Sequence, residues 1–195
     1  MPEAMPENFS TTLICLYFAA AFERGLELLQ PRVWLARARP RAWKDLFDLD
    51  RNARVWMCRD LLRLLGDWGI PVTKEYVEQF GGLKPDVWLE DAKHAIIVEN
   101  KIARHRAERE AEYLMFLRQQ VRKEKRAYLY SVPAGWAIDE NPAAEWWQFL
   151  DQADENLLCG IIKWDAEFVQ QMCSVLNVPQ WFQERLPHRI GERFL

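Results

Sequence analysis

The chain has 195 residues, half of them hydrophobic, with 26 Lys and Arg against 29 Asp and Glu and a formal net charge of −3. This length suffices for one domain that buries about 70% of the surface of its unfolded chain. The slightly acidic balance excludes attraction to nucleic acid by the field of the whole molecule, and the longest early apolar run, 13–22, is too short to cross a bilayer.

The cysteines and histidines show no disulfide or zinc spacing. The cysteines are scattered through apolar surroundings without a Cys-x-x-Cys pair, as expected for free thiols in a reducing compartment. The histidines are too dispersed for a zinc site. Together with a start that lacks the basic segment of a secretory signal, these features predict a cytoplasmic protein. The residues concerned are Cys15, Cys58, Cys159, Cys173, His94, His105 and His188.

The first 50 residues predict one helix followed by an interrupted segment. The apolar run 13–22 is typical of a helix. Pro31 and Pro40 then break helical continuity, so residues 31–50 are not expected to continue it.

A second helix and a strand are predicted next. Trp56 and four leucines at helical spacing predict a helix over residues 55–68, which Gly69 and Pro71 would end. Residues 72–80 predict the first strand, and a Gly-Gly pair then turns the chain.

Two apolar runs then form a predicted hairpin. Residues 84–90 and 94–102 are rich in Val, Ile, Leu and Trp, and the residues between them indicate a tight turn. If residues 92–93 form a two-residue loop, Asp91 faces His94.

The rest of the chain predicts alternating helices and strands. A helix rich in Arg and Glu is expected over 103–125, a strand over 126–132, a helix over 143–153, a strand over 157–163 and a closing helix over 165–176.

The hairpin brings together residues with catalytic chemistry. Counting back from its loop puts Asp86 opposite Glu99, and Lys101 projects from the same face because strand side chains alternate. Two opposed carboxylates repel each other, and a hard cation such as Mg2+ compensates because it prefers oxygen ligands. A metal-bound water oriented by the Lys101 ammonium suits phosphodiester hydrolysis. Solvated charges on a surface hairpin are the alternative, which the surrounding apolar runs disfavour.

The same residues carry a family resemblance. Pro85-Asp86, twelve intervening residues and then Glu99-Asn100-Lys101 after an apolar run resemble the PD-(D/E)XK nuclease superfamily, and in particular a bacterial family with a Glu-Asn-Lys motif. The resemblance implies Asp86, Glu99 and the main-chain carbonyl of Asn100 as metal ligands. It implies that Lys101 positions the nucleophile and steadies charge on the phosphate, with Mg2+ as the metal and Mn2+ as a substitute.

The resemblance also implies an acidic residue on the first helix. Glu7 precedes the apolar run and is the candidate for a third carboxylate. A glutamate that favours the dipole of a helix N-terminus explains it equally well. Glu23, Glu27 and Asp60 are rival candidates.

Nucleic-acid contacts are expected from the helix over 103–125, with Arg104, Arg106, Arg109 and Tyr113 as candidates. Members of the family often have a glutamine four residues before a tyrosine, where this chain has Arg109 before Tyr113. An arginine can contact phosphate in place of glutamine. A solvated arginine and a core tyrosine are the alternatives.

Charge is segregated along the chain. Residues 32–44 hold five basic residues and no acid, residues 104–126 hold eight against four, and residues 139–195 hold ten acids against four bases. The two basic stretches bracket the hairpin in sequence and would offer phosphate contacts. The alternative is that both basic stretches are ordinary solvent-exposed faces of helices, which would have the same charge pattern.

These observations predict a single α/β domain over 1–195 with a restriction-endonuclease-like core. The core would be a central mixed sheet of about four or five strands with helices on both faces. Residues 31–50 would be an insertion, and residues 165–195 a C-terminal helical extension.

The predicted function is Mg2+-dependent hydrolysis of nucleic-acid phosphodiester bonds, with DNA preferred to RNA as the expected substrate. The family resemblance implies a role in defence against foreign DNA or in repair. The expected partner is nucleic acid, and no membrane association is expected. The protein would act either as a homodimer that cuts both strands or as a monomer that cuts one, and the sequence is consistent with both. The first alternative is a catalytically silent nuclease-fold module that binds a protein or nucleic acid. The second is a different α/β protein in which the hairpin charges are structural.

Overall fold

The computed structural model describes residues 7–36, 39–101, 107–133 and 144–179. Its strands are β1 (Arg32–Trp34), β2 (Arg41–Ala42), β3 (Arg54–Met57), β4 (Val87–Glu90), β5 (His94–Asn100), β6 (Lys125–Pro133) and β7 (Leu157–Trp164). Its α-helices are α1 (Glu7–Arg24), α2 (Trp43–Leu46), α3 (Leu61–Asp67), α4 (Lys74–Phe80), α5 (Glu110–Gln119), α6 (Ala144–Leu150) and α7 (Ala166–Val175), and a 3-10 turn η1 covers Leu26–Leu28.

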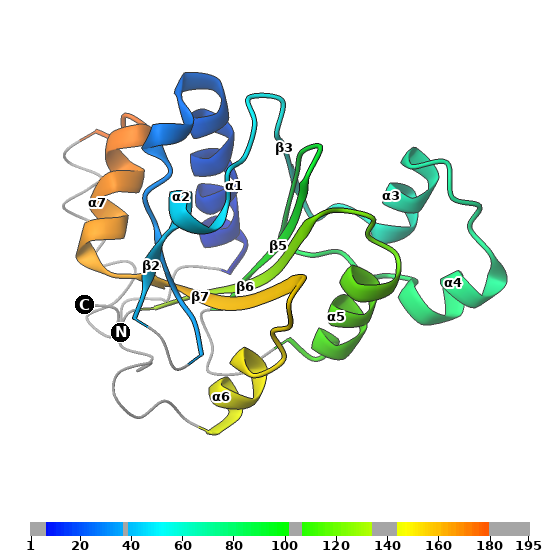
Figure 1. Ribbon diagram of the computed structural model, residues 1–195. Helices are drawn as coiled ribbons and strands as arrows, with labels where there is room; N and C mark the ends of the chain where they lie inside the picture. Colours follow the sequence, from blue (N-terminus) through cyan, green and yellow to red (C-terminus); the bar gives the residue numbers. More distant parts are fainter. Residues whose placement is uncertain (1–6, 37–38, 102–106, 134–143, 180–195) are drawn as a thin grey trace.

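A single mixed sheet lies at the centre of the described structure, with the strand order β2-β1-β7-β6-β5-β4-β3 (Figure 1). The strands β5, β6 and β7 are parallel to one another, while β4 and β3 are antiparallel additions on one side and β1 and β2 on the other. The predicted α/β class is thus confirmed, but the sheet has seven strands instead of four or five.

The β4–β5 hairpin has the predicted register. Val87 pairs with Val98 and Glu90 with Ala95. The main-chain N–H of Asp91 donates to the His94 carbonyl at 3.1 Å, which closes a two-residue loop. Because this loop length fixes the pairing, every side chain of β5 is assigned to a definite face of the sheet.

Each face of the sheet buries its own hydrophobic layer, which follows from the alternation of side chains along the central strands. On one face Ile96 and Leu129 pack with α1 and α7 through residues such as Phe18. On the other face Ile97 packs with α3, α5 and α6 through residues such as Phe116. Figure 1 shows α1 and α7 together on one side of the sheet and α5 and α6 on the other.

The predicted helix over 55–68 is wrong in its first half. Residues Arg54–Met57 instead form β3, which pairs antiparallel with β4 and sets Trp56 beside Trp88. Cys58 then turns the chain with a φ of 51°, and only α3 is helical. Pairing with β4 outweighs the helical spacing of the apolar residues here.

The strand predicted over 72–80 is also wrong, because these residues form α4. The hydroxyl of Thr73 caps the helix by accepting from the N–H of Tyr76 at 3.3 Å. The helix is mostly exposed and buries only Phe80.

Residues 31–50 contribute β1, β2 and α2, and β1 pairs with β7 to extend the sheet. The predicted strands at 126–132 and 157–163 are confirmed as β6 and β7, and the predicted closing helix as α7. The helix expected over 103–125 is shorter, since α5 covers Glu110–Gln119. In the part of the chain that is described, no helix is long and apolar enough to span a membrane.

Candidate functional site

Asp86 and Glu99 face each other where the β4–β5 hairpin ends. Glu99 is in β5, and Asp86 stands one residue before β4, so the β4–β5 register sets the two opposite each other. The N–H of Asp86 donates to Glu99 Oε1 at 3.3 Å, and the N–H of Asn100 donates to Asp86 Oδ2 at 2.8 Å. Each carboxylate is therefore held by a main-chain N–H from the opposite side of the hairpin.

Lys101 completes the group of three predicted catalytic side chains. Its Nζ lies 3.7 Å from Glu99 Oε2, and 21% of its side chain is exposed against 6% for Glu99. The main-chain N–H of Lys101 donates to the Ser131 carbonyl at 2.9 Å, which continues the β5–β6 pairing past Asn100. The structure thus brings Asp86, Glu99 and Lys101 together on one face of the sheet.

The field of the two carboxylates acts on neighbouring side chains. Burial, the Glu99 charge and the Asp86 charge raise the pKa of Tyr113 well above its ordinary value of 10.0. Burial and the same two charges raise the pKa of the Cys58 thiol. Both groups therefore stay protonated at neutral pH beside a site of negative potential.

Asn100 anchors this site to the first helix. Its side chain lies on the opposite face of β5 from Glu99 and is 2% exposed. Its Nδ2 donates to the Ser10 hydroxyl and to Thr11 Oγ1, the latter at 3.5 Å. The start of α1 is thereby held against the end of β5. Glu7 is the first residue of α1, one turn before Ser10 and Thr11, and its side chain lies outside the described residues.

The other candidates for a third carboxylate, Asp60, Glu23 and Glu27, either cap a helix or lie away from the Asp86–Glu99 pair. Asp60 is the N-cap of α3, and its Oδ1 accepts from the N–H of Leu62 at 3.0 Å. Glu23 is near the far end of α1, and Glu27 lies in η1.

The predicted nucleic-acid contacts are brought together only in part. Arg109 is engaged internally: its Nη1 donates to the Gly81 carbonyl at 2.8 Å, and its Nε lies 3.2 Å from Glu112. Tyr113 is buried beside the carboxylates, and its hydroxyl accepts from the N–H of Lys84 at 3.2 Å. Arg104 and Arg106 lie outside the described residues.

Sequence reasoning missed several neighbours of the site. Tyr130 pairs with Glu99 across β5 and β6, and its hydroxyl donates to Glu110 Oε2 at 2.6 Å. Cys58 reaches Asp86 because its N–H donates to the Asp86 carbonyl at 3.0 Å. The alternating tyrosines of β6 are a sequence signal that could have placed Tyr130 at the site. Cys58 could not be placed there without knowing that β3 pairs with β4.

The donor set suits a hard cation. Asp86 and Glu99 offer only oxygen atoms, as Mg2+ prefers, and Mg2+ needs few protein carboxylates. After burial, the Asp86 and Glu99 charges are the causes that raise the pKa values of Tyr113 and Cys58. Over the described residues no group of three or more His, Cys, Asp and Glu side chains could hold a metal ion.

No protein-family model, curated protein or solved structure matches the chain.

Proposed function

We propose that this protein is a metal-dependent nuclease that hydrolyses phosphodiester bonds through Asp86, Glu99 and Lys101. The register of the β4–β5 hairpin carries the proposal, because it sets two carboxylates opposite each other with an ammonium 3.7 Å from one of them. Two opposed carboxylates repel each other, and the single ammonium of Lys101 offsets only part of that repulsion. The proposal accounts for the presence of this pair within a buried part of the sheet.

The arrangement of the strands supports a restriction-endonuclease-like core. The catalytic hairpin leads through α5 into the parallel strand β6 and through α6 into β7, while α1 crosses the opposite face. This order agrees with the resemblance to PD-(D/E)XK nucleases, and β1, β2 and β3 would be additions to that core.

Asp86, Glu99 and the main-chain carbonyl of Asn100 would hold Mg2+, with Mn2+ as a substitute. When bound, the metal would supply a water of lowered pKa and neutralise charge on the phosphate. Lys101 would orient this nucleophile and steady the phosphate, since its ammonium already lies beside Glu99. Tyr113 lies beside the two carboxylates, and its hydroxyl would donate to a phosphate oxygen.

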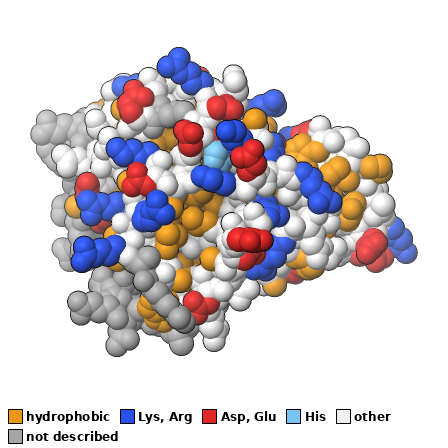
Figure 2. All heavy atoms as spheres, viewed as in Figure 1, with side chains coloured by type: hydrophobic (Ala, Val, Ile, Leu, Met, Phe, Trp, Pro, Cys, Tyr) orange, Lys and Arg blue, Asp and Glu red, His pale blue; other side chains and the backbone are white. Residues whose placement is uncertain are grey.

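The surface places a limit on how substrate is recruited. Lys and Arg side chains are interspersed with Asp and Glu on the face shown in Figure 2, and the net charge is −3. Binding would therefore rest on local contacts and would weaken steeply as salt rises. DNA is the substrate that the resemblance favours, with a role in defence or repair.

The test is cleavage of plasmid, single-stranded DNA and RNA during titration with Mg2+ and Mn2+. Lys101→Ala and Asp86→Asn should each lower the cleavage rate by about 100-fold or more, because each removes a group that acts on the reacting atoms. The matched controls are Lys93→Ala from the hairpin loop and Asp48→Asn, both exposed and remote from the site. Cleavage that persists in both site variants would sink the site assignment.

A catalytically silent nucleic-acid or protein-binding module is the second candidate. It is favoured by one observation: both carboxylates already accept main-chain hydrogen bonds and could serve the hairpin alone. Folded protein that binds neither Mg2+ nor Mn2+ by calorimetry and cuts none of the three substrates would favour this candidate.

A further inference from the structure

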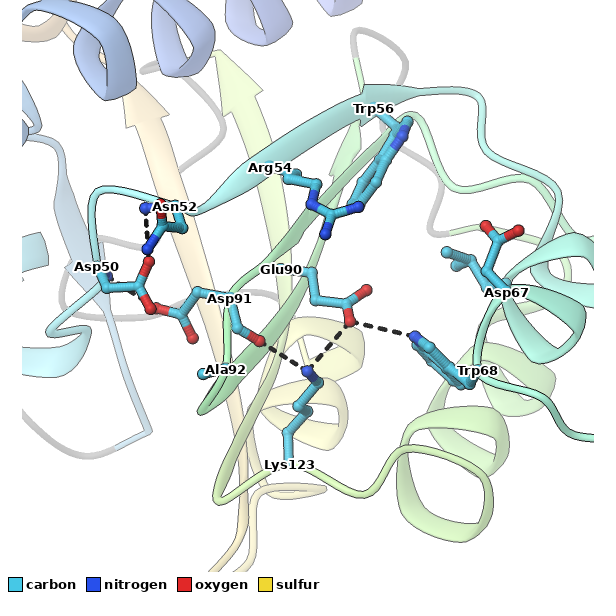
Figure 3. A pocket seen from close by; sticks show the side chains of 11 residues that line it. Asp50, Asn52, Arg54, Trp56, Asp67, Trp68, Glu90, Asp91, Ala92 and Lys123 are labelled. Atoms are coloured by element: carbon cyan, nitrogen blue, oxygen red, sulfur yellow. Dashed lines mark hydrogen bonds and ion pairs between the residues drawn. The ribbon is translucent and has the colours of Figure 1, made fainter.

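A cavity of about 390 Å³ opens at the other end of the β3–β4 pair, away from the carboxylates (Figure 3). Its walls come from β3, the end of α3, the β4–β5 hairpin and the segment after α5. The size falls in the range of ligand pockets, which are about 300–1,000 Å³. The residues that matter most are Asn52, Arg54, Trp56, Trp68, Glu90 and Lys123.

Two indole side chains give the cavity flat apolar walls. Trp56 comes from the edge strand β3, and Trp68 follows α3; both are half-buried. Trp68 is fixed in place, since its Nε1 donates to Glu90 Oε1 at 3.1 Å and its ring packs 6.0 Å from the ring of Trp88. The guanidinium groups of Arg54 and Arg59 each lie 5.9 Å from the centre of the Trp56 ring, so a planar ligand would stack beside them on the indoles.

Two polar groups at the cavity are open to a ligand. The guanidinium of Arg54 lies over the Trp56 ring at 5.9 Å and, among the described residues, makes no hydrogen bond or ion pair. The carboxamide of Asn52 is likewise without a partner within the described ranges. In Figure 3 the Arg54 guanidinium points into the cavity above Glu90.

Glu90, by contrast, is fully engaged at the base of the cavity. It accepts from Trp68 Nε1 and Trp88 Nε1, and Lys123 Nζ lies 3.1 Å from its Oε1. Asp67 forms an ion pair with Arg59. The lining holds Asp50, Asp67, Glu90 and Asp91 against Arg54 and Lys123, which disfavours a bare anion.

We propose that this cavity binds a nucleobase, with guanine the best match. A base offers a flat ring for the indoles, carries no charge and presents hydrogen-bond acceptors at its edge. Guanine O6 and N7 accept two parallel hydrogen bonds from an arginine, and Arg54 has the free guanidinium for them.

From the position of the cavity we infer that the bound base belongs to the nucleic-acid strand that is cut. This step, unlike base binding itself, rests on the proposed nuclease function. The side chains of Glu90 and Asp86 project to the same face of the sheet. They are four residues apart along the extended chain, which is a distance of about 13 Å. A single strand of nucleic acid covers this distance in about four stacked nucleotides. The route between them runs along the edge strand β3, and residues 51–63, which cover β3 and the start of α3, hold four arginines against one aspartate. Of these arginines, Arg59 is paired with Asp67.

The experiment is titration of the full chain with guanosine, adenosine, cytidine and uridine 5′-monophosphates, followed by tryptophan fluorescence and calorimetry. The four probes carry the same phosphate, so only the base differs. Guanosine monophosphate should bind most tightly. Arg54→Gln should weaken its binding by about 10-fold or more, and Trp56→Phe should weaken it less while removing part of the fluorescence change.

Matched controls come from β1, next to the edge strand at the opposite side of the sheet. Trp34→Phe changes a half-buried strand tryptophan with Lys163 Nζ over its ring at 4.0 Å, and Arg32→Gln changes an exposed strand arginine; neither should alter binding. Equal affinity for the four probes, or wild-type affinity in Arg54→Gln, would overturn the proposal. Lys101→Ala should keep nucleotide binding while losing cleavage. Nucleotide binding without any cleavage by the wild-type protein would sink the nuclease function and leave the base site standing.

Discussion

Asp91 shows how one residue sets the geometry of the hairpin. Its side chain is 2% exposed, and it accepts from the N–H groups of Lys93 at 2.7 Å and His94 at 2.6 Å. It also accepts from the N–H of Asp50 at 2.9 Å. Burial alone would raise the pKa of Asp91, but these donors and the His94 ring outweigh it and lower the pKa from 3.8. The charged form is therefore stabilised by folding.

Asp91→Asn should lower the free energy of unfolding by about 1–3 kcal/mol near neutral pH, because it removes a charged acceptor of several buried donors. The folded-state pKa lies below the unfolded one, so this stabilisation is present above pH 3.8 and is lost as the pH falls through the folded pKa. Urea unfolding at about pH 7 and about pH 2.5 measures the change. Asp48→Asn, at an exposed position, should cost under about 0.5 kcal/mol. A penalty equal at both pH values would contradict the account.

The pairing of Asp86 with Glu99 was predictable from sequence because a two-residue loop leaves a single register, and the alternation of side chains then assigns the faces. The contacts of Arg109 were not predictable in this way. Its partners, the carbonyls of Gln79 and Gly81, lie at the end of a helix that the sequence pattern predicted as a strand. Contacts between distant segments depend on packing that periodicity alone does not specify.

At the scale of elements, the errors cluster between Arg54 and Phe80. Short segments carry little periodicity, so one turn of apolar residues fits either a strand or a helix. The structure resolves this ambiguity at two capping residues, Asp60 and Thr73, which begin α3 and α4. The long buried strands β5, β6 and β7 were predicted correctly because their apolar runs are bounded by turns.

Asp60→Ala should destabilise the protein by about 1 kcal/mol, within the range of about 0.5–2 kcal/mol for the loss of an N-cap. The reason is that Asp60 Oδ1 accepts from the Leu62 N–H at 3.0 Å, and α3 buries Leu61, Leu64 and Leu65. Asp60→Asn is the matched control, because it keeps an oxygen acceptor and should cost little. Thermal and urea unfolding compare the two variants. An asparagine variant as unstable as the alanine variant would show that the charge, not the cap, matters.

At the scale of the whole molecule, the sheet separates two hydrophobic layers that share its backbone. Ile96 and Ile97 are adjacent in β5 and fully buried, yet they belong to different layers. Each layer contains tryptophans, such as Trp43 in one and Trp88 in the other, which report on it by fluorescence. If the layers form one cooperative unit, a substitution that leaves a void in either layer must destabilise the whole chain.

Ile96→Ala and Ile97→Ala should therefore each lower the free energy of unfolding by about 2–5 kcal/mol, the usual cost of truncating a buried isoleucine. Their matched burial and shared strand make them controls for each other. Urea unfolding followed by fluorescence and by far-UV circular dichroism should give coincident single transitions for both variants. Two separate transitions in either variant would show that the layers unfold independently. If both probes show the same shift of a single unfolding transition, the two layers unfold together. The Asp86–Glu99 pair and the cavity lined by Trp56 lie on one face of the sheet, and their stability would then depend on the packing of α1 and α7 on the other face.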